Sequence, residues 1–187
     1  MRSFDTYAAE FIPIRLMLSI AIVAAISGLL AVGYTNFSVT NTEHQVENQW
    51  LSLQSELYSL LGSGVARDVD VPGDSAGTKR VYTFDLPDNL VYLAFGVDPD
   101  TDNNGMLQTG LTEEGAVLCY KVEGGSKHIK WLDDQFCFRE GLLGNGEWDL
   151  VNQGFILDSS GVSTLTFELV QQQGKQYLLI HSSDSYT

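Results

Sequence analysis

The feature that most constrains this chain is an uninterrupted apolar segment close to its N-terminus. Residues 16–34 read LMLSIAIVAAISGLLAVGY and contain no charged residue and no proline. As a helix rising about 1.5 Å per residue, the segment would be about 30 Å long, which matches the hydrocarbon core of a bilayer. We therefore expect a transmembrane or filament-core helix here, preceded by a short cytoplasmic segment, residues 1–15.

Basic residues set the expected orientation of this helix. Arg2 and Arg15 precede the apolar segment, and the first basic residue after it is Arg67. Positive charge is retained on the cytoplasmic side, so the rest of the chain is expected outside the cytoplasm. A cleaved secretory signal peptide is the alternative, since Ala31 and Gly33 have the small-residue spacing of a cleavage site.

Small residues are concentrated within the apolar segment. They allow the backbones of two membrane helices to approach closely, so we expect the segment to self-associate through them. The candidate packing residues are Ala21, Ala24, Ala25, Gly28 and Ala31.

The start of the apolar segment resembles the N-terminal helix of type IV pilins, especially the archaeal pilin and archaellin-like class. The similarity rests on Phe11-Ile12-Pro13-Ile14-Arg15-Leu16-Met17 and the apolar residues that follow. The resemblance implies that the mature chain begins at Phe11 and that its helix packs with copies of itself in a filament core. Glu10 departs from the Gly or Ala that usually precedes the cut, so an uncut, membrane-resident protein fits the resemblance equally well.

Residues 35–64 are expected to connect the apolar segment to a folded domain through an amphipathic helix. Thr40 and Glu43 have the spacing of a capping box, which would start a second helix or restart the first. An apolar stripe follows, and we expect it to pack on the protein's own sheet, with a partner helix as the alternative. The stripe consists of Val46, Trp50, Leu53, Leu57 and Leu60.

Residues 65–187 are expected to form an extracytoplasmic β-rich domain. Short runs of β-branched and aromatic residues alternate here with Gly-, Asp- and Asn-containing turns. About eight strands predict an antiparallel β-sheet or β-sandwich, and the fold class is therefore α+β. The expected strands are residues 80–86, 90–97, 116–122, 128–132, 135–139, 154–157, 163–170 and 176–181.

The net charge limits the partners of this domain. The bases and acids of the first 35 residues cancel, so the remaining residues carry the whole net charge of −14. A field of that sign repels phosphates, which excludes nucleic acid as a partner. A surface layer or a glycan is compatible with it, and Trp50, Trp131 and Trp148 are candidate contact residues unless they are buried in the core.

An acidic loop is the sharpest candidate for ion binding. Asp98-Pro99-Asp100-Thr101-Asp102-Asn103-Asn104-Gly105 spaces hard oxygen ligands as in calcium loops, although it is not a complete EF-hand. An ordinary acidic surface loop is the alternative. If calcium binds, we expect Asp98, Asp100, Asp102 and Asn104 to hold it.

Two covalent features are also expected outside the cytoplasm. Cys119 and Cys137 lie in expected strands and would normally form a disulfide, worth about 3 kcal/mol, with two buried thiols as the alternative. Asn36-Phe37-Ser38 is an N-glycosylation sequon close to the expected membrane surface.

No catalytic motif is recognisable in the sequence. His44, His128 and His181 lack zinc-type spacing, and there is no nucleophile elbow, P-loop or dinucleotide fingerprint. We therefore expect not an enzyme but a structural subunit of a cell-surface filament. The alternative is a membrane-tethered extracytoplasmic adhesion or accessory domain that does not polymerise.

Overall fold

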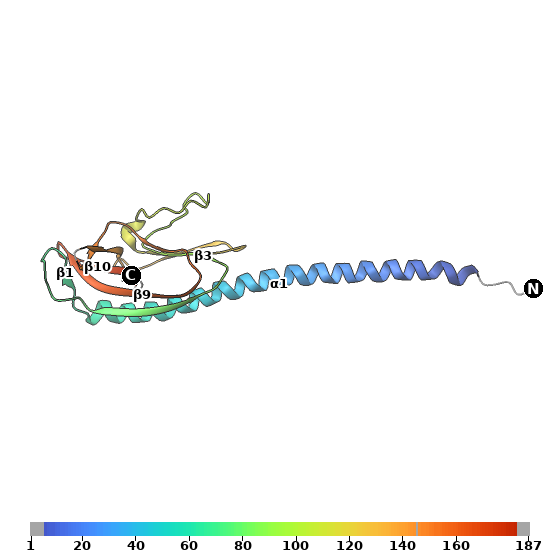
Figure 1. The fold of residues 1–187 in the computed structure, drawn as a ribbon, viewed down its shortest axis with the longest axis horizontal. Coiled ribbons are helices and arrows are strands. Elements are labelled where there is room, and N and C mark those ends of the chain that lie inside the picture. The colour runs from blue at the N-terminus through green and yellow to red at the C-terminus, as the bar shows by residue number, and fades with distance from the viewer. Residues whose placement is uncertain (1–5, 145, 183–187) are drawn as a thin grey trace, which may run out of the picture. The chain divides into compact units, whose positions relative to one another are not determined.

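The computed structural model describes residues 6–144 and 146–182, and it confirms the α+β class (Figure 1). The chain divides into two compact units, one ending at Asn41 and one beginning at Thr42. In order, the elements are helix α1 (Thr6–Ser63), β1 (Arg67–Asp68), β2 (Lys79–Leu86), β3 (Leu90–Phe95), the short helix η1 (Glu113–Gly115), β4 (Val117–Val122), β5 (Lys127–Trp131), β6 (Phe138–Gly144), β7 (Glu147–Leu150), β8 (Phe155–Leu157), β9 (Gly161–Gln172) and β10 (Lys175–Ser182).

A single helix, α1, replaces the two helices and connector that the sequence suggested. The hydroxyl of Thr40 donates to the backbone oxygen of Asn36, 3.0 Å away and one turn earlier. Thr40 therefore acts as a residue inside a helix, where such back-bonding is common, and not as a cap. The expected end of the helix is confirmed, because α1 stops at Ser63 and the Gly64 N–H donates to the Leu60 oxygen at 2.8 Å.

The larger sheet has the order β1-β9-β10-β6-β7, with β2 also paired to β9. The strands expected at residues 163–170 and 176–181 are confirmed as β9 and β10, which form an antiparallel hairpin whose turn places Gln173 and Gly174 at positive φ. Two pairings are parallel, β1 with β9 and β10 with β6. The larger sheet is therefore mixed, with antiparallel pairs as expected and two parallel pairs between strands from distant parts of the sequence.

The smaller sheet has the order β5-β4-β3-β8 and is antiparallel throughout. All four of its strands were expected. The strand expected at residues 135–139 is displaced to β6, because Asp134 and Gln135 form a turn and the strand begins only at Phe138. The short strands β1 and β7 were not predicted.

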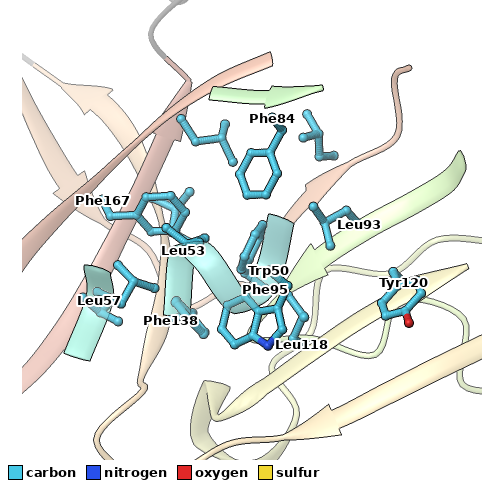
Figure 2. Packing of buried hydrophobic residues seen from close by; sticks show 14 of the residues in the cluster. Trp50, Leu53, Leu57, Phe84, Leu93, Phe95, Leu118, Tyr120, Phe138 and Phe167 are labelled. Carbon is cyan, nitrogen blue, oxygen red and sulfur yellow. The ribbon is translucent and has the colours of Figure 1, made fainter. Parts of the chain in front are cut away.

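The core lies where the apolar stripe of α1 meets both sheets. All five stripe residues are at most 3% exposed, and Leu53, Leu57 and Leu60 are completely buried. Figure 2 shows Trp50, Leu53 and Leu57 among aromatic and aliphatic side chains of the sheets. The prediction that the stripe packs on the protein's own sheet is therefore confirmed. The main contributors from the sheets are Phe84, Leu93, Phe95, Leu118, Tyr120, Phe138, Phe167, Leu169, Leu178 and Ile180.

Because this stripe joins the two sheets, truncating it should destabilise the whole β-rich unit. We expect Leu53→Ala to lower the free energy of unfolding by about 3 kcal/mol, the usual cost of a large core cavity. Leu51→Ala is the matched control on the same helix, since Leu51 is 53% exposed, and it should change stability by less than about 0.5 kcal/mol. Chemical denaturation followed by circular dichroism measures both, and equal effects would contradict this packing.

Candidate functional site

The first candidate site is the apolar part of α1, described here within its own unit. Its most apolar 18-residue window has a mean hydropathy of 2.4 and is entirely exposed. Ile14, Leu16, Met17 and Leu18 are each more than 60% exposed, as are Val23 and Leu30. Among the described residues this is the one helix long and apolar enough to cross a membrane. Exposing such a surface to water is unfavourable, so it requires a cover.

The five predicted packing residues share one face of this helix. At about 100° per residue, Ala21, Ala24, Ala25, Gly28 and Ala31 fall within an arc of about 120°. Gly33 lies about 140° from Gly28 around the axis and is not part of this face. A Cβ added at either glycine would meet nothing within 4 Å. The face is therefore free for another helix. Asn36, the sequon residue, is also exposed.

The acidic loop is neutralised by lysines from neighbouring strands. Lys127 Nζ lies 2.8 Å from Asp98 Oδ2 and also donates to the Asp100 backbone oxygen at 2.9 Å. Lys121 Nζ lies 3.4 Å from Asp100 Oδ2. Burial opposes ionisation of Asp100, but the N–H groups of Gly105 and Asn104, together with Lys121, outweigh it and leave the pKa of Asp100 below its usual value.

These contacts correct the expected calcium site. Asp102 is exposed, and the Asn104 side-chain oxygen accepts from the Met106 N–H at 2.7 Å. Across residues 6–144 and 146–182, no three His, Cys, Asp or Glu side chains are grouped as metal ligands. The lysine contacts favour the alternative, an acidic loop without a metal, because β4 and β5 supply the neutralising charge as ammonium groups.

We predict that Lys127, not calcium, stabilises this loop. Lys127→Met leaves the nearly buried Asp98 carboxylate without its cation, so the Tm should fall by roughly 5–10 °C. The control is Lys130→Met, because Lys130 is more exposed and pairs with Glu47 at the surface. Differential scanning fluorimetry with calcium or magnesium completes the test. A calcium-specific rise in the Tm of the unmodified chain would contradict the prediction.

The expected disulfide is also wrong. Cys119 and Cys137 are both buried free thiols. Cys119 belongs to β4, whose neighbours are β3 and β5, whereas Cys137 precedes β6, whose neighbours are β10 and β7. The two strands are thus not adjacent, as the disulfide required. Burial raises the pKa of the Cys119 thiol to about 12, and the Cys137 Sγ donates to the Asp134 backbone oxygen at 3.2 Å.

The three tryptophans have different environments. Trp50 is in the core, and Trp148 stacks on His181 with ring centroids 3.9 Å apart. Trp131, at the end of β5, is 61% exposed. It lines a pocket of about 580 Å³, together with Glu113, Glu114, Ala116, Leu132, Asp134, Cys137 and Lys175. This pocket is the second candidate site, and of the three tryptophans only Trp131 is placed to contact a ligand there.

A left-handed turn forms one wall of this pocket. Glu113, Glu114 and Gly115 have φ values of 45°, 56° and 85°. Backbone in this region is unfavourable for residues other than glycine and persists only where the surroundings impose it. Buried Arg139 imposes it here, since its Nη1 donates to the backbone oxygens of Glu114 and Phe138, each at 2.8 Å. A Cβ at Gly115 would lie 2.4 Å from that same nitrogen.

The turn also fixes a charge pair at the pocket rim. Lys175 Nζ lies 3.1 Å from Glu114 Oε2, and the Arg139 guanidinium lies 3.9 Å from the same oxygen. The hydrogen bond from Lys175 lowers the pKa of Glu114, and Glu114 in turn raises the pKa of Lys175. Sequence reasoning missed this group, because neither the left-handed conformation nor a pairing across 61 residues has a local signal.

The histidines and the Asp133-Asp134 pair do not converge on one site. His128 stacks on Tyr120 and lies 2.9 Å from Glu43, whereas His181 stacks on Trp148. Asp133 accepts a hydrogen bond from the Tyr58 hydroxyl at 2.7 Å.

Residues 13–183 match the model of a family described as a domain of unknown function, DUF7311. This chain belongs to the DUF7311 family. The matched range includes both the apolar segment and nearly all of the β-rich unit. Comparison with curated proteins gives no match, and neither does comparison with solved structures.

We predict that the left-handed turn carries measurable strain. Glu113→Gly removes an unfavourable positive φ, so the Tm should rise by roughly 1–3 °C despite the extra flexibility of glycine. Glu123→Gly is the control, because Glu123 is also exposed but has no positive φ, and it should lower the Tm slightly. Thermal melts of both variants measure these changes in Tm and show whether the turn is strained. A fall for Glu113→Gly would show that the turn is relaxed.

Proposed function

We propose that this DUF7311 chain is a structural subunit of a cell-surface filament, assembling through its N-terminal apolar helix. The observation that carries the proposal is the contrast along α1. Val46 to Leu60 bury their apolar stripe within the β-rich unit, whereas the apolar side chains from Ile14 to Tyr34 are exposed. A membrane covers these side chains before assembly, and copies of the same helix cover them afterwards.

Two further observations support assembly by helix packing. The small residues from Ala21 to Ala31 share one face, which is the arrangement that permits close contact between helices. The residues from Phe11 to Met17 resemble the start of type IV pilins, especially of the archaeal class, in which such a helix forms the filament core. The acidic β-rich unit then forms the outer, extracellular surface, where its charge favours solubility.

The second candidate function is a single-span, membrane-tethered adhesion or accessory domain. Glu10 favours it, because the residue before the proposed mature terminus is unlike that of a typical pilin processing site. Intact-mass analysis distinguishes the two. A mature terminus at Phe11 in filament fractions supports the subunit, and an intact Met1 confined to monomers in the membrane supports the tethered domain.

The small face gives a mutational test of assembly. Gly28→Leu places a bulky side chain on this face, where nothing in the single chain obstructs it. We expect it to weaken self-association in membranes by about tenfold or more while leaving the Tm of the β-rich unit unchanged. Gly33→Leu is the matched control, since it adds the same side chain about 140° away around the helix.

Chemical cross-linking in membranes and negative-stain imaging measure the effect. Loss of cross-linked oligomers and filaments in the Gly28 variant alone is the expected result. Unchanged assembly of the Gly28 variant, or an equal loss in both variants, would contradict packing through the small face.

A further inference from the structure

The pocket beside Trp131 has the composition of a small-molecule site and is not used by the proposed filament assembly. Its volume of about 580 Å³ falls within the usual range for such sites, which combine apolar surface with a few polar groups. Trp131, Leu132 and Ala116 supply the apolar surface, while Glu113, Asp134 and Lys175 supply polar groups.

Trp131 provides a flat apolar platform at the pocket. It is 61% exposed although it is the largest apolar side chain in the lining. The other two tryptophans, Trp50 and Trp148, are buried, so Trp131 differs from them in its exposure. The face of an indole ring stacks well on the C–H surface of a sugar ring, which is apolar on its faces and polar around its edge.

The polar groups suit the hydroxyls at such an edge. Among the described residues, the carboxylates of Glu113 and Asp134 have no hydrogen-bond or ion-pair partner, so both can accept from hydroxyl groups. Lys175 is held in place by Glu114, 3.1 Å away, and its ammonium retains further donors for a ligand. The pocket therefore offers two acceptors and one donor around one stacking face.

The charge and the aromatic content of the pocket lining disfavour anionic and cationic ligands. Three carboxylates against one lysine disfavour an anionic ligand such as a phosphate or an acidic sugar. An organic cation is recognised by several aromatic rings arranged as a cage, whereas Trp131 is the one aromatic residue in this lining. We propose that the pocket binds a neutral carbohydrate, with Trp131 stacking on a sugar ring and Glu113, Asp134 and Lys175 bonding its hydroxyl groups.

The test uses the full-length chain in polyoxyethylene detergent micelles, which have neither sugar nor ammonium headgroups. The probes are maltohexaose, chitohexaose and a mannohexaose, with choline chloride as the cationic comparison. Saturable binding of at least one hexasaccharide is expected with a Kd of about 1 mM or below, measured by calorimetry and by tryptophan fluorescence.

Three variants assign the binding to this pocket. Trp131→Ala should weaken binding by about tenfold or more, whereas Trp131→Tyr should largely preserve it because a flat ring remains. Leu143→Ala removes an exposed apolar side chain that does not line the pocket, and it should bind like the unmodified chain. Unchanged Tm values show that each variant is folded.

Two outcomes would overturn the inference. The first is no saturable binding of any hexasaccharide up to about 10 mM, or binding that Trp131→Ala leaves unchanged. The second is Trp131-dependent binding of choline without binding of a hexasaccharide, which would make the pocket a cation site. Neither outcome bears on filament assembly, which the Gly28 and Gly33 variants test separately.

Discussion

The structure depends on one helix, α1, whose apolar side chains are buried against the sheets in its C-terminal part and exposed in its N-terminal part. The C-terminal part of α1 buries Leu53, Leu57 and Leu60 completely and thereby joins the two sheets through a common core. The apolar part before Asn41 has no such sheet within its own unit, and its side chains remain exposed. The first arrangement stabilises the domain, and the second leaves an apolar surface whose cover, on our proposal, is a bilayer or copies of the same helix.

The excess of acidic residues is organised around a small number of basic ones. Lys121 and Lys127 neutralise the loop that begins at Asp98, and buried Arg67 lies 3.0 Å from Glu168 on β9. The Arg139 guanidinium holds the left-handed turn by donating a hydrogen bond to the backbone oxygen of Glu114. These four bases therefore neutralise or hold buried groups of the β-rich unit, while most of the net charge of −14 stays in water.

The pattern of apolar residues in the sequence predicted the buried helix face and most of the strands, because both depend on local sequence. The spacing of Val46 to Leu60 identified the buried face of α1, and short β-branched and aromatic runs identified most of the strands, including β9 and β10. Contacts between distant segments were not predictable in this way. The parallel pairing of β6 with β10, the position of Cys119 away from Cys137, and the approach of Lys175 to Glu114 all depend on topology. The small face of α1 was predicted, but the pocket was not, because its lining residues come from separate loops and strands.

The two unpaired cysteines have a consequence for how the chain matures. A domain whose stability rests on a helix, two sheets and lysine–carboxylate pairs does not require an oxidant to complete its fold. Among the described residues there is no disulfide for a reductant to break, so reductant should leave the fold intact. Its folding is thereby separated from the thiol chemistry of the compartment it occupies, and depends instead on bringing β6, β9 and β10 together.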